Sequence, residues 1–215
     1  MKGIIYKDFY LGFGLLKNLL SFIASFLIVI AVVVLMDGPF GFIIISGITV
    51  PIIGSTLLQV SVEEDEKTNF DKMQLTYPMT KDEIMLSKYL TGLIMMGVCL
   101  IINCIICFLY VHVFKTISLS AAIDIYIFAF IFGLIFMALS NFIFVLLGNK
   151  KGLVLYMIMI IFMAGGYGAT SWRIDYISIL QNHINMILTI GSVIGILMLV
   201  GSYFASLKVY KKRYS

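Results

Sequence analysis

Residues 61–88, SVEEDEKTNFDKMQLTYPMTKDEIMLSK, form the only long polar segment of this chain, and apolar runs lie on both sides of it. The segment holds 11 of the 26 charged residues. A charge run of this kind is usually a solvated surface. The alternative is a docking element for a soluble partner, with the rest of the chain arranged to present it.

The residues in the middle of this segment predict a short helix. Thr68 or Asn69 can cap it, because a side-chain oxygen there accepts a hydrogen bond from a free backbone N–H. Four residues then share one face at the spacing i, i+3, i+4 and i+7, namely Phe70, Met73, Gln74 and Tyr77. The sequence thus predicts a mainly apolar helical face on a charged loop.

A second helix is predicted directly after this one. Pro78 disfavours helical backbone at Tyr77, so the short helix ends there. Thr80 and Glu83 then form a T-x-x-E capping box in front of the apolar run that begins at Ile84.

The composition identifies an integral membrane protein, with 61% hydrophobic and 12% charged residues. A spanning helix needs about 20 apolar residues, and six runs are long enough. They lie near Leu16–Met36, Phe40–Val60, Met85–Val111, Ala122–Leu147, Leu153–Thr170 and Ile184–Leu207. We therefore predict an all-α polytopic membrane protein, with residues 1–215 forming one transmembrane domain.

The basic residues predict the orientation. If both termini are cytoplasmic, 13 of the 15 Lys and Arg residues lie on the cytoplasmic side, and only Lys115 and Arg173 lie outside. Residues 61–88 are then a cytoplasmic loop, and residues 171–183, which include Trp172, form an external segment at the membrane interface. This bias explains the net charge of +4, so the charge does not require a nucleic-acid partner.

Residues 1–17 carry an apolar helical face made by Ile5, Phe9, Phe13 and Leu16. This pattern fits a helix lying in the headgroup region, and it fits equally a simple flank of the first span.

The second span contains Pro51, which removes a backbone hydrogen bond and bends a helix. At 100° per residue, four polar residues fall within about a third of the circumference, namely Thr49, Ser55, Thr56 and Gln59. They either join helices through hydrogen bonds or line a substrate path.

Several chemistries are disfavoured by what the sequence contains. Cys104 and Cys107 form a C-x-x-C in mid-membrane without further zinc ligands, so we expect packing roles for them and for Cys99. Glu63 and Glu64 resemble part of a membrane-protease motif, but both histidines are predicted on the other side of the membrane. There is no phosphate-binding G-x-x-x-x-G-K-[ST], and no charge lies deep in a span. The chain is therefore not predicted to be an enzyme, and energy for transport must come from another subunit.

Three stretches resemble the permease subunit of type-2 ABC exporters, in particular small six-span bacterial permeases with a separate ATPase. They are EDEKTNFDK at 64–72, YPMTK at 77–81 and SKYL at 87–90. In that family, E-x-D-E-K-x-x-x-D-K, L-P-[VM]-[ST]-[RK] and S-K-Y-L follow one another in the coupling loop between spans two and three. Tyr77 stands where leucine is common.

The resemblance implies that this loop docks on a cytoplasmic ABC ATPase. The residues it assigns to coupling are Glu64, Asp65, Glu66, Lys67, Phe70, Asp71, Lys72, Met73 and Tyr77. ATP and Mg²⁺ would be bound by the partner, with no cofactor on this chain. The resemblance also implies pairing with a second or paralogous permease in the cytoplasmic membrane.

Related permeases export amphipathic peptides such as phenol-soluble modulins or confer resistance to bacitracin-like peptides. The expected cargo is therefore an amphipathic or hydrophobic molecule such as a cytolytic or antimicrobial peptide. The alternative is a membrane immunity or scaffold protein that uses the 61–88 loop only for binding.

Overall fold

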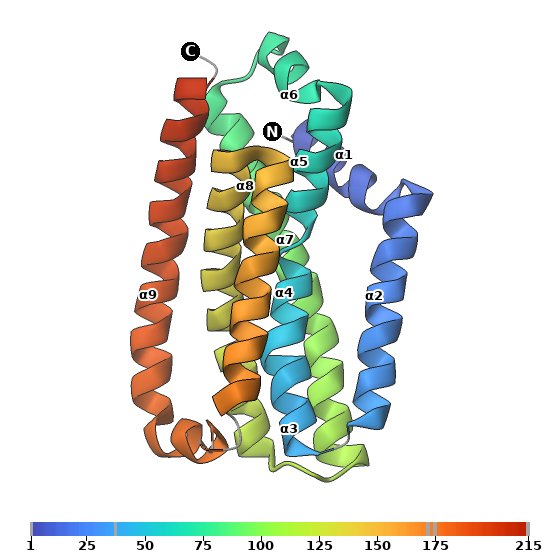
Figure 1. Cartoon of the computed structure of the whole chain (residues 1–215), viewed down its shortest axis with the longest axis vertical. Coiled ribbons are helices and arrows are strands. Elements are labelled where there is room, and N and C mark those ends of the chain that lie inside the picture. Colours follow the sequence, from blue (N-terminus) through green and yellow to red (C-terminus); the bar gives the residue numbers. More distant parts are fainter. Residues whose placement is uncertain (1, 37, 171–172, 174–175, 214–215) are drawn as a thin grey trace.

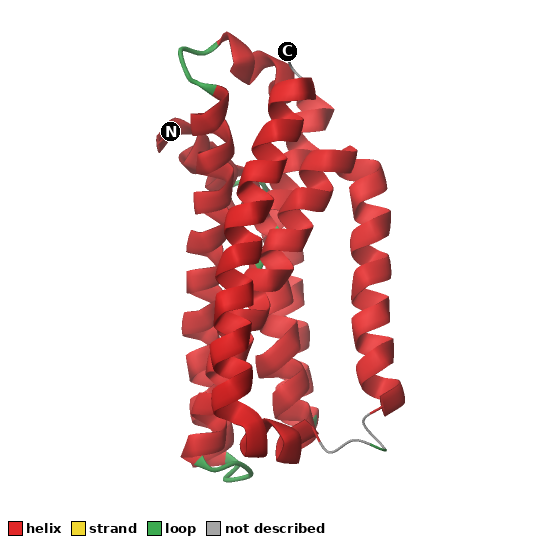
Figure 2. Ribbon diagram, turned by 90° about the vertical axis from the view of Figure 1, so that its left-hand side faces the viewer, coloured by secondary structure: helices red, strands yellow, loops and turns green. Residues whose placement is uncertain are grey.

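The computed structural model describes residues 2–36, 38–170, 173 and 176–213, and within them all regular structure is helical. Figure 2 shows that the connecting loops lie at the two ends of a bundle of long helices. Both chain termini lie at the same end of the bundle, together with α5 and α6 (Figure 1). We call this the terminal end. The all-α class is confirmed.

The chain begins with α1 (Lys2–Phe13) and the long α2 (Leu16–Leu35). The next stretch is interrupted and comprises α3 (Pro39–Phe42), the π-helix η1 (Ile43–Thr49), α4 (Val50–Gly54) and α5 (Leu57–Thr68). Short α6 (Phe70–Met73) and the 3₁₀ turn η2 (Gln74–Thr76) precede α7 (Lys81–Phe108) and the π-helix η3 (Leu109–Val113). The chain ends with α8 (Leu119–Thr170) and α9 (Tyr176–Arg213).

Five helices among the described residues are long and apolar enough to cross a membrane. One of them is α8, whose 52 residues are not straight, because Gly148 has φ 74° and ψ −177° and the helix turns there. Figure 1 shows the two arms of α8 running side by side from this turn. A side chain at Gly148 would be strained by this φ and would also meet Glu66, whose Oε1 lies 2.6 Å from the position of a Cβ.

The π-helix η1 and Pro51 together explain an interhelical hydrogen bond. In η1 the N–H of Val50 donates to the carbonyl of Ile45, five residues earlier. Pro51 has no N–H to continue this pattern, so the carbonyl of Ser46 needs another donor. Asn103 on α7 supplies it, with Nδ2 3.2 Å from that oxygen. Asn103 therefore joins α7 to the interrupted second helix.

The interrupted second helix packs closely against α7. A Cβ on Gly54 would lie 3.3 Å from both the Cα of Met96 and the Cβ of Cys99. Around this contact, α2, α4 and α7 share an apolar core that includes Phe22 and Val50. The backbones of α4 and α7 can approach because residue 54 has no side chain.

The last helix packs along α8 on one edge of the bundle. Gly195, the second glycine of the G-x-x-x-G in α9, faces the Ile131 carbonyl of α8. Nearer the terminal end, the Tyr89 hydroxyl shares hydrogen bonds with Ser202 at 2.6 Å and Ser206 at 2.9 Å. These contacts tie α7, α8 and α9 together.

We predict that Gly54→Val lowers the melting temperature of the purified protein, because the added atoms overpack the contact with α7. Overpacking of this kind costs about 1–3 kcal/mol. The matched control is Gly97→Val, since nothing lies within 4 Å of a Cβ built at Gly97. Thermal unfolding in detergent measures both variants. Equal melting temperatures for the two would contradict the close packing of α4 on α7.

Candidate functional site

The predicted coupling segment lies at the terminal end, where α1 packs against α5 and α7 (Figure 1). The buried face of α1 is formed by Ile4, Asp8 and Gly12. The predicted face with Phe9 and Phe13 is only half-buried, although these rings also pack on the core. The sequence prediction missed Asp8, because a carboxylate is not expected on the inner face of a helix.

A buried cluster of charges joins α1 to α5 and α7. Asp65 accepts hydrogen bonds from Lys7 at 2.5 Å and from Lys88 at 2.7 Å. Lys7 also pairs with Asp8 at 3.0 Å, and the Ser61 hydroxyl donates to Asp8 at 2.7 Å. The positive charges of the two lysines balance the negative charges of the two aspartates, so the cluster can be buried at a tolerable cost in free energy.

The aromatic part of the segment is held by the same lysine. Lys7 Nζ lies 4.4 Å from the centre of the Phe70 ring, a cation–π contact. The Phe70 ring in turn packs edge-on against Tyr77, with ring centres 6.1 Å apart. One cation of α1 therefore positions both Asp65 and Phe70.

The short helix differs in detail from its prediction. Thr68 is the last residue of α5, and its hydroxyl donates to the Glu64 carbonyl. Asn69 occupies the cap position but in left-handed backbone, with φ 55°, and its side chain forms no capping bond. This kink, together with the change from α6 to the 3₁₀ turn η2, separates the residues that the sequence predicts on one helical face.

The members of that face consequently differ in burial. Met73 and Tyr77 are 54% and 39% exposed, whereas Phe70 is half-buried. Gln74 is buried, and its Nε2 donates to the Tyr210 hydroxyl at 3.0 Å. The predicted capping box of Thr80 and Glu83 is confirmed.

The C-terminal part of α9 holds the segment from its other side. Besides the Tyr210–Gln74 hydrogen bond, Lys211 pairs with Asp82 at 2.8 Å. Near the turn of α8, the backbone N–H of Asn149 donates to Glu66 at 2.9 Å. Both chain ends and the α8 turn therefore fix the coupling segment.

The remaining predicted coupling residues are exposed or half-buried. Lys67 pairs with Glu63 at 2.5 Å and with Glu64 at 3.2 Å along α5. Lys72 is exposed, and Asp71 lines a cavity of about 140 Å³ next to Lys88.

The four predicted path residues do not share one face. The π-helix η1 and the break at Ser55 and Thr56 change the angular spacing, so the assumption of 100° per residue fails here. Ser55 is buried, and Thr49 donates to the Ile44 carbonyl at 2.9 Å. Thr56 and Gln59 line a cavity of about 300 Å³ between α2 and α5.

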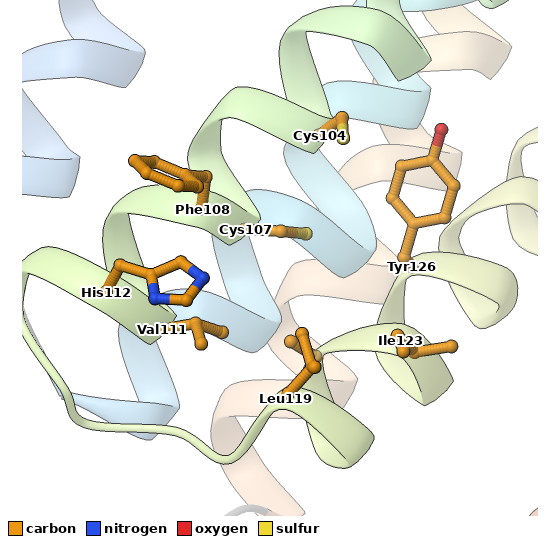
Figure 3. Close-up of a pocket in the computed structure, with 9 residues that line it drawn as sticks. Cys104, Cys107, Phe108, Val111, His112, Leu119, Ile123 and Tyr126 are labelled. Atoms are coloured by element: carbon orange, nitrogen blue, oxygen red, sulfur yellow. The ribbon is translucent and has the colours of Figure 1, made fainter.

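The cysteines lie along α7 as free thiols. Cys104 and Cys107 line an apolar pocket of about 260 Å³ with His112 and Tyr126 (Figure 3). In the described part of the chain no group of three or more His, Cys, Asp or Glu residues could hold a metal ion. Cys99 has the expected packing role, whereas Cys104 is exposed.

The predicted external segment 171–183 falls largely on residues outside the described ones. Trp172 and Asp175 are among them, and the side chains from Tyr176 to Asn182 are not described either. The segment's role stays a prediction.

Comparison with known families matches residues 3–211 to a family described as ABC-2 family transporter protein. The chain belongs to this ABC-2 family. No curated protein and no solved structure matches it significantly. An ABC-2 protein is the membrane component of an ABC transporter and not its catalytic ATPase, so this one is a multi-pass membrane protein with a partner ATPase subunit.

The buried ionic cluster of this ABC-2 protein gives a direct stability test. Lys88→Met leaves two aspartates against one lysine, and breaking a buried pair costs about 3–5 kcal/mol. Adding Asp65→Asn restores the charge balance between Lys7 and Asp8, so the double variant should melt higher than Lys88→Met.

Lys211→Met is the control, because the Lys211–Asp82 pair is about half exposed. Such a surface pair contributes about 1 kcal/mol or less. If Lys88→Met and Lys211→Met lowered the melting temperature equally, the cluster would not carry the stability assigned to it.

Proposed function

We propose that this protein is the permease subunit of an ABC exporter in the cytoplasmic membrane. Its coupling segment, residues 61–88, would dock on a separate ATPase that binds ATP and Mg²⁺. The observation that carries this proposal is the exposed pair Met73 and Tyr77 on a segment fixed from three sides. Exposed apolar groups on a rigid support are typical of a binding surface.

The proposal includes six spans with both termini in the cytoplasm. The turn at Gly148 supports counting α8 as two spans, since a bilayer core of about 30 Å is crossed by about 20 residues. The terminal end also carries the coupling segment and most basic residues, which favours the cytoplasmic side.

The cargo we propose is an amphipathic or hydrophobic molecule such as a cytolytic or antimicrobial peptide. A substrate path beside α2 is supported by Thr56 and Gln59, because both line the cavity between α2 and α5. A second or paralogous permease would complete the transporter. It would cover helices whose surfaces are apolar and exposed, such as α9.

Docking is tested by co-purification of the ATPase from detergent at equal permease expression. Met73→Ala, Tyr77→Ala and Phe70→Ala should each weaken binding by about 2 kcal/mol or more, since central apolar anchors are commonly hot spots. Phe70→Ala acts partly by releasing Lys7.

Glu64→Gln and Lys67→Gln are the controls and should lose far less, because rim charges affect mainly encounter rate. Full ATPase binding by Tyr77→Ala and Phe70→Ala would contradict docking through this surface. Docking without cargo-stimulated ATP hydrolysis would favour the scaffold or immunity role.

Orientation is tested by single cysteines at Thr68 and Ser120 in a cysteine-free background. Both residues are exposed and they lie at opposite ends of the bundle. A membrane-impermeant maleimide added to intact cells should label Ser120→Cys but not Thr68→Cys. The reverse pattern would place the termini outside.

A further inference from the structure

The apolar pocket of about 260 Å³ lies between the end of α7, with η3, and the beginning of α8 (Figure 3). Its lining extends from Cys104 to His112 on one side and from Leu119 to Tyr126 on the other. The first of these stretches corresponds to about 12 Å along the helix axis. The pocket is therefore a slot that runs along the two helices.

The lining offers few groups for hydrogen bonds to a ligand. The Tyr126 hydroxyl donates to the Leu100 carbonyl at 3.2 Å, and the Cys107 thiol lies 3.8 Å from a hydroxyl of η1. The Cys104 thiol is a weak donor and a weak acceptor. Among the lining side chains, all of which the structure describes, this leaves His112 as the strong polar group, at the end next to the loop before α8 (Figure 3). An occupant of the rest of the slot must be apolar.

The slot opens sideways, on the outer surface of the bundle. Phe108, Leu119 and Ile123 line it and are exposed. The floor consists of smaller side chains, namely the buried Ala122 and the half-buried Cys107. Both α7 and α8 are long and apolar enough to cross a membrane. At this depth, the exposed surface of a multi-pass membrane protein therefore contacts lipid chains.

The size of the slot restricts what can fill it. Apolar cavities stay dry, and an empty slot would leave its lining atoms without contact partners. Over a length of about 12 Å, the volume corresponds to a cross-section of about 20 Å². This is the width of one extended alkyl chain. A helix of a second copy, which is about 10 Å across with its side chains, cannot enter.

We propose that one acyl chain of a bilayer phospholipid binds in this slot. The lipid belongs to the leaflet farther from the terminal end. Its chain enters beside His112 and Leu119, where the spanning helix ends shortly before the exposed Lys115, and its methyl end lies near Cys104 and Tyr126. The bound chain fills the gap between α7 and α8. The inference uses the membrane location of the protein and does not depend on the proposed export function.

Photolabelling of the purified chain tests this in phosphatidylcholine nanodiscs without ATPase or cargo. The probe is phosphatidylcholine with a diazirine in one acyl chain, and mass spectrometry locates the labels. Labelling should concentrate on residues 104–112 and 119–126. The internal comparison is residues 154–162 of α8, where Val154 and Ile158 are as exposed but do not line the slot.

Two positions of the diazirine test the direction of the chain. A diazirine near the methyl end should label close to Cys104 and Tyr126. A diazirine next to the glycerol ester should label close to Val111 and Leu119. The reversed pattern would contradict entry beside His112.

Two variants fill the slot. Cys104→Phe places a ring at an exposed position of the wall, and it should lower labelling of residues 119–126 to the level of residues 154–162. Ala122→Leu raises the floor and should lower labelling of residues 104–112 in the same way. Each effect is read on the helix that the variant leaves unchanged.

Ile105→Phe is the matched control. Ile105 is the next residue of α7 and is also exposed, but it does not line the slot. This variant should label like the unmodified chain.

Equal labelling of the slot and of residues 154–162 would show ordinary lipid contact and would overturn the proposal. Preferential labelling that survives both Cys104→Phe and Ala122→Leu would overturn it equally, because the chain would then bind elsewhere. Weaker labelling of the slot than of residues 154–162, with cross-links between two copies, would show a protein contact in place of the lipid. None of these outcomes bears on docking through Met73 and Tyr77, since no ATPase is present.

Discussion

Two lysines from different helices meet one buried carboxylate, Asp65, at the terminal end of the bundle. Each charge would be costly to bury alone, so Lys7, Lys88 and Asp65 must stay together. Asp8 completes the balance from α1. The position of the coupling segment depends on this set, because α1 has no other ionic contact with α5 and α7 among the described residues.

Because the ionic cluster fixes the coupling segment, the segment has a rigid inner side and an outer side that contacts solvent. Inside, Lys7 holds Phe70, and Tyr210 holds Gln74. Outside, Met73 and Tyr77 stay exposed. A surface that is already ordered loses little conformational freedom on binding, which supports the docking proposed for it. In that proposal, α1 and α9 would follow a displacement of the segment, because both contact it.

Within the membrane part, irregular backbone has a local cause. Pro51 cannot continue the hydrogen bonds of η1, and Asn103 supplies the missing donor. The resulting change of register turns Ser55 inward while Thr56 and Gln59 reach the cavity beside α2. The polar cavity beside α2 and the proposed docking surface thus lie close together in the sequence, since residues 53–63 line the cavity and Met73 and Tyr77 follow them.

The sequence by itself determined the helical class, the membrane location and the start of α7. These follow from local composition, from apolar length and from the Thr80 capping box. Only the tertiary structure decided which coupling residues are buried. Asp65 and Glu66 are neighbours in sequence, yet one is enclosed by lysines of two helices and the other caps the α8 turn. Asp8 was not predictable either, since a buried carboxylate is tolerable only where distant residues supply compensating charge, and that pairing exists only after the helices have packed.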